Sequence, residues 1–234
     1  MYSMAKRYLF FLFSIVALFL SGCARVTPVC RVPPVQVAPM QYGSIQNPII
    51  DSDITLSEAV RKWAPPWIKR KQSIVDVLYY SFDGMIHKGQ VVMDERLTGD
   101  IRKVFNVALE TRFPVQSVIP ISHDKFHRNG KYNSDGASMK LNNTSCFNYR
   151  RATGSKNLSM HSYGYAIDIN PVQNPYIKKR TVFPHGAVYD PRKPGTLTRD
   201  CPVVKTFISL GWTWGGNWKS LKDYQHFEKV LPRS

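Results

Sequence analysis

Two short segments, far apart in the chain, hold residue types suited to metal chemistry. Segment 159–170 contains His161 and Asp168, and segment 222–228 contains His226. A neutral imidazole and a carboxylate are good zinc ligands, and a catalytic zinc has three protein ligands and one open position. We therefore treat His161, Asp168 and His226 as candidate zinc ligands. Residue types alone also allow an alternative to a metal site. In that alternative, each segment is an ordinary strand with a histidine that is hydrogen-bonded within the protein and an acidic residue at the surface.

Two acidic residues flank His226 at informative spacings. On a strand, His226 and Glu228 share one face while Phe227 faces the core. Asp223 lies three residues before His226 and would sit on the preceding turn, close to the metal. A carboxylate there is suited to act as a general base, because zinc lowers the pKa of a bound water to about 7.

The first segment needs a strand and a bend to place its two candidate ligands. Within a strand over 165–170, the two isoleucines face the core and Asp168 faces the other side. His161 is seven residues before Asp168, an odd number that would put the two on opposite faces of one regular strand. Gly164 supplies a bend that can bring both to one site.

Other parts of the chain carry weaker catalytic signals. The sequence contains no HExxH motif, and the run SHDKFHRNGK has no apolar face, so we predict that His123 and His127 are solvated loop residues. Ser122 and Lys125 match the SxxK motif of serine DD-peptidases. No SxN or KTG element follows, which disfavours a serine enzyme.

The elements that must position these residues are mixed in type. We predict helices over 55–63, 97–112 and 203–210. We predict strands over 90–93, 115–121, 165–170, 212–214 and 225–230, with irregular structure over 122–160. Helices interspersed with short strands, without a regular βαβ alternation, predict a single α+β domain with a small sheet flanked by helices.

The N-terminal fifty residues have the pattern of an export signal followed by a tether. A basic pair, Lys6 and Arg7, precedes an apolar run of about a dozen residues, so we predict a signal peptide over 1–22. The sequence LSGC resembles the lipobox of bacterial lipoproteins, which implies cleavage before Cys23 and a lipid on its sulfur. Five prolines in 24–50 predict an extended tether over 23–50, leaving 51–234 as the folded domain.

Export changes the meaning of the chain's charge. The formal charge of +16 becomes +14 once Lys6 and Arg7 are removed. We expect anionic wall polymer and lipid headgroups as counterparts, and no nucleic acid. Ala24 after the lipidated cysteine lacks the Asp that retains lipoproteins at the inner membrane, which favours a periplasmic, outer-membrane location if the host has two membranes.

Three cysteines remain besides Cys23, and two of them fall in the folded region. Cys146 and Cys201 are candidates for a disulfide in an oxidising compartment, with two buried free thiols as the alternative. Cys30 lies in the tether. No CxxC pair indicates a thiolate metal site.

The segments SMHSYGYAIDINPVQNPY and KDYQHFE resemble the zinc D-alanyl-D-alanine carboxypeptidase family of peptidoglycan peptidases. That family includes L-alanyl-D-glutamate endopeptidases of the phage endolysin type, and its pattern is SxHxxGxAxD followed later by DxxH. The segments DGASMKLNNTSCFNYR and WTWGG resemble the same family, so the similarity covers roughly residues 80–230. It implies a zinc DD-peptidase fold with a mainly antiparallel sheet.

The resemblance also implies roles for individual residues. One Zn²⁺ per chain would be bound by His161, Asp168 and His226, with Asp223 as base. Arg150 would stabilise the oxyanion or a substrate carboxylate, although Arg151 lies one residue out of register. The substrate-facing wall would include Asp135, Ser138, Ser159 and residues 143–145, with turn-forming polar residues as the alternative. His87 and Glu228 are candidates to hold the zinc ligands in place.

The function expected from this resemblance is hydrolysis of an amide bond in the stem peptide of peptidoglycan. The most favoured reaction is D-alanyl-D-alanine carboxypeptidase activity, and the alternatives within the family are cleavage of L-alanyl-D-glutamate or of a crosslink. From a different class, a non-catalytic wall-binding lipoprotein would use the positive charge for adhesion. The filled ligand and base positions argue against that reading.

Overall fold

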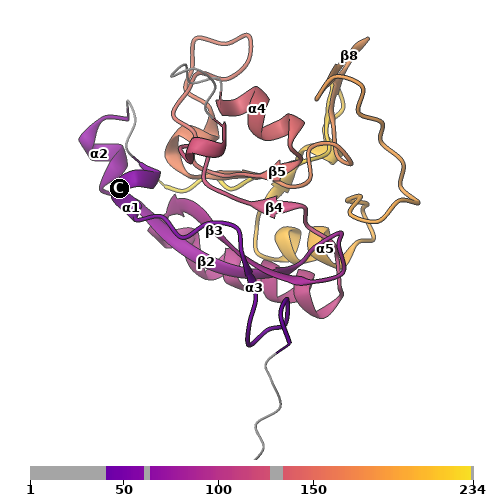
Figure 1. Ribbon diagram of the computed structural model, residues 1–234. Coiled ribbons are helices and arrows are strands. Elements are labelled where there is room, and N and C mark those ends of the chain that lie inside the picture. The colour runs from indigo at the N-terminus through magenta and orange to yellow at the C-terminus, as the bar shows by residue number, and fades with distance from the viewer. Residues whose placement is uncertain (1–40, 61–63, 127–133, 233–234) are drawn as a thin grey trace, which may run out of the picture. The chain divides into compact units, whose positions relative to one another are not determined.

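The longest strands form a hairpin, β2 (Gln72–Tyr80) and β3 (Ile86–Asp94), paired from Gln72–Asp94 to Tyr80–Ile86. The computed structural model describes residues 41–60, 64–126 and 134–232, all in one compact unit (Figure 1). Of these two strands, only residues 90–93 of β3 were predicted from the sequence. The signal was present, because Val75, Val77 and Tyr79 alternate with more exposed residues.

Two amphipathic helices close the core against this hairpin. α3 (Thr98–Glu110) follows the short 3-10 helix η1 (Glu95–Leu97) and buries Ile101, Val104, Phe105 and Ala108. α5 (Pro202–Ser209) packs beside α3 and buries Val203, Val204 and Phe207 (Figure 1). The predictions of helices over 97–112 and 203–210 are therefore confirmed, the first with slightly narrower bounds and the second shifted by one residue toward the N-terminus.

A second sheet carries the candidate zinc ligands. Its strands are β6 (Ala166–Asp168), β11 (His226–Glu228) and β9 (Thr213–Trp214), with β11 in the middle and both pairings antiparallel. Ile167 and Phe227 pair across β6 and β11 and are fully buried, so the predicted core face of each strand is correct. The predicted strands over 165–170, 212–214 and 225–230 are present but shorter.

Other strands form a third sheet and a short parallel pair. The third sheet has the order β10 (Lys222–Asp223), β7 (Tyr176–Lys178) and β8 (Thr181–Phe183), and both its pairings are antiparallel. The parallel pair is β4 (Ser117–Val118) with β5 (Asn143–Thr144). The strand predicted over 115–121 is therefore reduced to two residues.

Short helices fill the connections. α1 (Leu56–Ala59) has the predicted capping box of Thr55 and Glu58, and residues 61–63 of the predicted helix lie outside the described residues. α2 (Pro66–Lys69) follows, with Pro66 in its first turn. The region 122–160, predicted as irregular, contains η2 (Asp124–Phe126) and α4 (Ser134–Lys140). η3 (Met160–Tyr163) and η4 (Gly215–Asn217) are single turns next to the second sheet.

The folded unit begins earlier than residue 51. β1 (Ile49–Ile50) runs parallel to β3, with Ile49 opposite His87, and Gly43 O accepts a hydrogen bond of 2.8 Å from Ile86 N. Residues 41–50, expected as the end of the tether, are therefore part of the fold. Residues 1–40, with the predicted signal peptide, Cys23 and Cys30, lie outside the described residues.

The architecture agrees with the α+β class predicted from the sequence. Small, mainly antiparallel sheets combine with helices around a core to which β2, β3, α3, α5 and β11 all contribute. Among the described residues, no helix has the length and apolar character that crossing a bilayer requires.

The candidate disulfide is absent. Cys146 and Cys201 are both free thiols in the structure, which corrects that expectation in favour of its alternative. Cys146 is buried in the core, and Cys201 is partly buried against it. Burial and the charge of Asp168 raise the pKa of the Cys146 thiol well above its usual range, so the thiol stays neutral.

Candidate metal centre and its cleft

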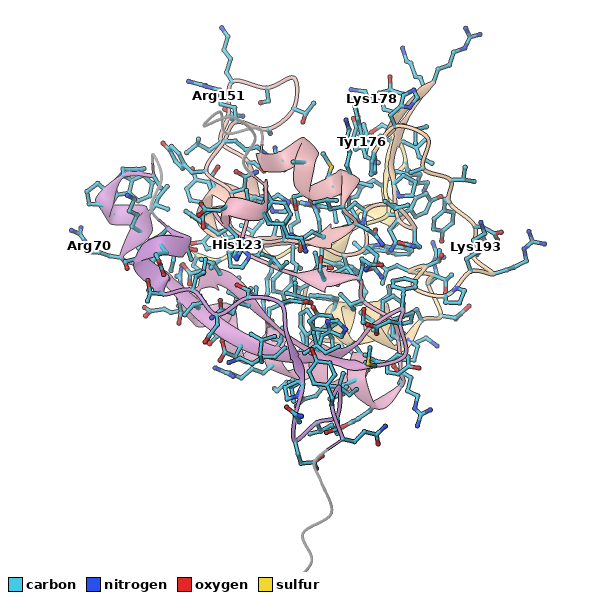
Figure 2. All side chains as sticks on the ribbon, viewed as in Figure 1. Arg70, His123, Arg151, Tyr176, Lys178 and Lys193 are labelled. Carbon is cyan, nitrogen blue, oxygen red and sulfur yellow. The ribbon has the colours of Figure 1, made fainter. Side chains whose placement is uncertain are left out.

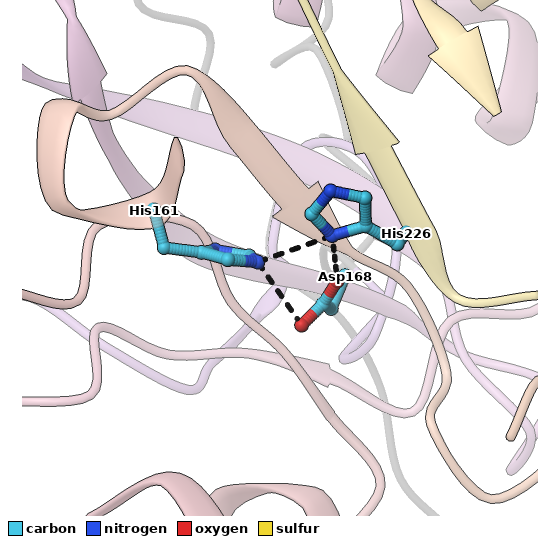
Figure 3. Close-up of side chains that lie close together, drawn as sticks. All are labelled: His161, Asp168 and His226. Atoms are coloured by element: carbon cyan, nitrogen blue, oxygen red, sulfur yellow. Dashed lines mark hydrogen bonds and ion pairs between the residues drawn. The ribbon is translucent and has the colours of Figure 1, made fainter. Parts of the chain in front are cut away.

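The side chains of His161, Asp168 and His226 converge on one point (Figure 3). Nδ1 of His226 lies 3.0 Å from Oδ1 of Asp168, and Nε2 of His161 lies 3.3 Å from Oδ2 of Asp168. The two imidazole nitrogens are 3.3 Å apart. One ligand atom from each residue lies within 4.8 Å of the others, and all three side chains are buried. The three predicted ligands are thus brought together as a metal would require.

Strand register and a left-handed glycine assemble this cluster. Asp168 and His226 are direct partners in the β6–β11 ladder, so their side chains share one face of the sheet. His161 comes from η3, which ends at Gly164 with a φ of +71°. A Cβ at Gly164 would lie 2.3 Å from Oε1 of Gln72, so only glycine fits both the conformation and the space. The bend predicted at Gly164 is therefore present, and it lets the chain turn so that His161 lies next to Asp168.

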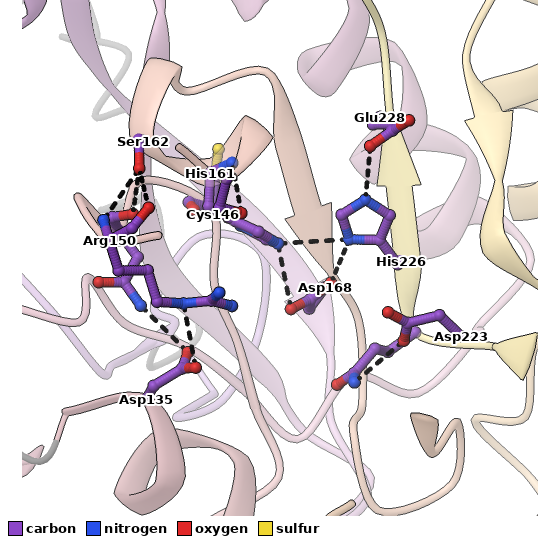
Figure 4. Close-up of polar contacts among 12 residues, drawn as sticks. Asp135, Cys146, Arg150, His161, Ser162, Asp168, Asp223, His226 and Glu228 are labelled. Carbon is purple, nitrogen blue, oxygen red and sulfur yellow. Dashed lines mark hydrogen bonds and ion pairs between the residues drawn. The ribbon is translucent and has the colours of Figure 1, made fainter. Parts of the chain in front are cut away.

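Hydrogen bonds on the far side of each imidazole set which nitrogen faces the cluster. Nδ1 of His161 lies 2.6 Å from the carbonyl oxygen of Cys146, which can only accept. Nε2 of His226 lies 3.0 Å from Oε2 of Glu228 (Figure 4). With those nitrogens protonated, Nε2 of His161 and Nδ1 of His226 present lone pairs to a shared point beside a carboxylate. This donor set fits zinc, whose histidine ligands are held in this way.

The electrostatics of the cluster favour a positive charge at its centre. Burial opposes ionisation of Asp168, but the two histidines outweigh it and hold the pKa of that carboxyl well below its usual range. Burial disfavours a charged His226, yet hydrogen bonds to Asp168 and Glu228 raise its pKa to about 10. A bound metal would take the place of the proton that these carboxylates otherwise stabilise.

Asp223 is the acidic group predicted to act as a base. It ends β10 and lines the same cleft as the three candidate ligands. Burial, and next the negative charge of Asp168, raise its pKa to about 6. Nε2 of Gln225 donates a hydrogen bond of 3.2 Å to Oδ1 of Asp223. A carboxyl with this pKa can exchange protons near neutral pH, as a general base must.

The cluster lies in a cleft of about 450 Å³ that is open to solvent. Besides the candidate ligands, its lining comes from α4, the segment before η3, the β7–β8 hairpin and residues 218–228. Its lining includes Asp135, Arg150, Ser159, Tyr176, Lys178, Phe183, Trp218 and Glu228. The ring of Trp218 lies 5.4 Å from that of His226, so it belongs to the cleft wall.

Arg150, rather than Arg151, faces this cleft. Nε of Arg150 pairs with Oδ2 of Asp135 at 3.1 Å, and Oδ1 of Asp135 accepts from Asn148 at 3.0 Å (Figure 4). Ser162 ties the backbone at residue 150 to η3, since Arg150 N donates to its Oγ at 2.9 Å. Arg151 is exposed and extends outward (Figure 2). The one-residue ambiguity in register is therefore decided for Arg150.

Several predicted site residues are placed elsewhere. His87 lies between Asp51 (3.1 Å) and Asp83 (2.9 Å), stacked on Tyr79, and does not line the cleft. It therefore does not hold the zinc ligands. His87 was not placed on a strand beforehand, because only residues 90–93 of β3 were predicted.

Part of the predicted substrate wall is internal scaffolding. Ser138 is 1% exposed and its Oγ accepts from Asn143, whose side chain also bonds Ile119. Both residues join α4 to the β4–β5 pair and face no solvent. Ser159 does line the cleft, and its Oγ accepts from His161 N at 3.3 Å, so it caps η3.

The other catalytic signals of the sequence lie outside the cleft. Ser122 and Lys125 are not among the residues that line it, and His123 accepts a hydrogen bond from Lys125 N. His127 lies outside the described residues. The cleft residues Tyr176, Lys178 and Phe183 were not predicted from the sequence. Tyr176 ends the segment SMHSYGYAIDINPVQNPY and the other two follow it, but none of them carries a metal-binding pattern. The Cys146 carbonyl was not predicted either, because no side-chain pattern could reveal it.

An α+β unit with a buried His–Asp–His cluster, a carboxyl of raised pKa and an open cleft has the features of a metallopeptidase. A model of the family described as D-alanyl-D-alanine carboxypeptidase matches residues 153–229, one third of the chain. The matched segment includes the three candidate ligands and Asp223, and it supports a peptidase at the level of the family. Asp135 and Arg150 lie before it. Searches of curated proteins and of solved structures found no significant match.

Proposed function

We propose that this chain is a zinc-dependent peptidase that hydrolyses an amide bond in the stem peptide of peptidoglycan. The observation that carries the proposal is the cluster itself: three buried ligand atoms within 4.8 Å, with correctly oriented imidazoles, beside Asp223 in a solvent-open cleft. The family match over the same residues supports it.

The residues around the cluster have separable roles in this proposal. Bound zinc would supply Lewis-acid polarisation of the scissile carbonyl and a lowered pKa for water. Asp223 takes the proton of the attacking water and returns it to the leaving nitrogen as the C–N bond breaks. Arg150 offsets negative charge on the substrate, either on the carbonyl oxygen or on a carboxylate. Glu228 and the Cys146 carbonyl hold the two imidazoles in orientation.

D-alanyl-D-alanine carboxypeptidase activity is the reaction we favour, because it is the description carried by the matched family. Cleavage of L-alanyl-D-glutamate or of a crosslink would use the same zinc chemistry. Mass spectrometry of muropeptides after digestion identifies the bond directly. We expect loss of one alanine from pentapeptides, abolished by a chelator and restored by Zn²⁺. If the zinc-loaded protein cleaves none of the muropeptides, the proposal is contradicted and a non-catalytic wall-binding role is favoured instead.

We further propose that the chain is exported and anchored by a lipid on Cys23, facing the cell wall from a bacterial membrane. The sequence LSGC and the +14 charge of the chain after removal of 1–22 support this. Metabolic labelling with a fatty acid tests it, with Cys23→Ser as the unlabelled control. Equal labelling of both chains, or of neither, would contradict the anchor.

A further inference from the structure

A second hollow of about 500 Å³ is lined in part by η3 and by none of the candidate metal ligands. We call it the aromatic groove and define it by Trp67, Gln72, Met160, Tyr163 and Tyr165, which all line it. Trp67 comes from α2 and Gln72 from the start of β2, whereas the other three come from η3 and the residues just after it. The metal site does not use the groove.

Three aromatic rings form a row in the groove. The Trp67 and Tyr163 rings are 6.4 Å apart, and the Tyr163 and Tyr165 rings are stacked at 5.6 Å. Trp67 is 50% exposed, which leaves a large apolar ring facing water. A continuous row of ring surfaces beside a hollow is suited to a ligand that itself has flat apolar faces.

Polar groups beside the rings hold them in place and offer hydrogen bonds. Arg96 donates to the hydroxyl of Tyr165 at 2.6 Å and pairs with Asp94, which is a lining residue. Nε2 of Gln72 donates to Tyr163 O at 3.1 Å. Oε1 of Gln72 is buried and has no hydrogen-bond partner within the described part of the chain. The groove is thus pre-formed, and its surface contains both apolar and polar groups.

The groove and the catalytic cleft share one wall. Met160 lines both, and His161 follows it directly in η3. A polymer with a branch could therefore lie in the groove while its branch reaches the metal centre. Peptidoglycan has this form, because its stem peptides branch from a strand of N-acetylhexosamine rings.

We propose that the aromatic groove binds the glycan strand of the substrate, as a saccharide-binding site separate from the peptide cleft. The proposal rests on the proposed function for the identity of the polymer. Sugar rings present a face of C–H groups to the electron-rich faces of aromatic rings, and their hydroxyl and acetamide groups meet polar partners at the edges. The row of rings and the mixed polarity of the groove provide both kinds of contact.

Binding of a glycan without any peptide tests the groove directly. The probe is the tetramer of N-acetylglucosamine, titrated into the zinc-loaded full chain by calorimetry. We expect binding that Trp67→Ala weakens by about tenfold or more and that Trp67→Phe largely retains. Tyr42→Ala is the matched control, since Tyr42 is 65% exposed and does not line the groove. No binding by the native chain, or equal binding by Trp67→Ala, would overturn the proposal.

Cleavage kinetics separate this proposal from the proposed function. We expect Trp67→Ala to lower kcat/KM about tenfold on disaccharide-linked stem peptides and to leave kcat/KM on free stem peptides unchanged. An equal loss on both substrates would mean a structural role and would overturn the glycan site. If the native chain cleaves neither substrate, the proposed function fails, and the tetramer titration still decides the glycan site.

Discussion

His226 lies directly opposite Asp168 in the antiparallel β6–β11 pair, and its Nδ1 lies 3.0 Å from Oδ1 of Asp168. The backbone ladder therefore sets the distance between two candidate ligands before any metal binds. Only His161, carried on η3, depends on a separate element for its position. The cluster therefore combines a pair placed by strand register with a third ligand placed by a separate turn.

Removal of the ligands should abolish both metal content and activity. We expect about one zinc per chain in the native protein and near zero in the double variant His161→Ala, His226→Ala, measured by elemental analysis. Zinc should raise the Tm of the native chain and leave that of the double variant unchanged, since a ligand stabilises only a state that binds it. Muropeptide cleavage by the double variant would show that the site is assigned wrongly.

Glu228 should strengthen zinc binding by orienting His226, without itself binding the metal. Its carboxylate accepts from Nε2 of His226, and that hydrogen bond, against the opposing effect of burial, holds the pKa of Glu228 below its usual range. Glu228→Ala should weaken zinc binding by about 10- to 100-fold, measured by competition with a chromogenic chelator. Glu228→Gln keeps an acceptor oxygen and should lose less. Identical losses in the two variants would argue against the orienting role.

Asp223→Asn should separate metal binding from turnover. Asparagine retains an oxygen that can accept from Gln225 Nε2 but cannot take a proton. We expect zinc content to stay at the native level while kcat falls by about 10²- to 10⁴-fold. A variant that binds zinc and keeps native kcat would exclude Asp223 as the base.

The same substitution should stabilise the metal-free protein at neutral pH. The pKa of Asp223 is about 6 in the folded state, above its ordinary value, so the folded state binds the extra proton between about pH 4 and 6. Above pH 6 the carboxylate is charged in both states and weakens the fold by at most about 3 kcal/mol. Asp223→Asn should therefore raise the free energy of unfolding at pH 8 and make little difference at pH 4, measured by urea titration.

The control for that titration is Asp200→Asn, because the side chain of Asp200 is 94% exposed. We expect no comparable pH-dependent gain from it. A gain of equal size in both variants would trace the effect to net charge rather than to burial of Asp223.

Gly164→Ala should damage the metal centre through the backbone. The residue has a φ of +71°, and a Cβ would lie 2.3 Å from Gln72 Oε1 and 2.5 Å from Asp94 N. Gly154→Ala is a matched control, since Gly154 has a φ of +72° with no atom within 4 Å of its Cβ position. We expect Gly154→Ala to cost about 1 kcal/mol of stability and Gly164→Ala clearly more, with weakened zinc binding in the latter alone. Equal effects would mean that strain, not close packing, governs this turn.

Local patterns in the sequence predicted much of the fold. The apolar spacing of 97–112 predicted α3, and alternation in 165–170 predicted which faces of β6 are buried, because both depend only on the periodicity of one element. Most of hairpin β2–β3 was not predicted, although Val75, Val77 and Tyr79 alternate with more exposed residues. His87 was therefore not assigned to a strand from the sequence. The short pair β4–β5 is parallel and joins segments 26 residues apart, which no local pattern reveals.

By itself, the sequence determined the residue types of the site: His161, Asp168, Asp223 and His226, and the glycine that must precede the strand. Tertiary structure alone decided which atoms face one another, that Arg150 and not Arg151 enters the cleft, that Ser138 is internal and that the cysteines stay apart. The physical reason is that side-chain chemistry is a property of each residue, whereas strand register, burial and imidazole orientation arise from contacts between segments distant in the chain.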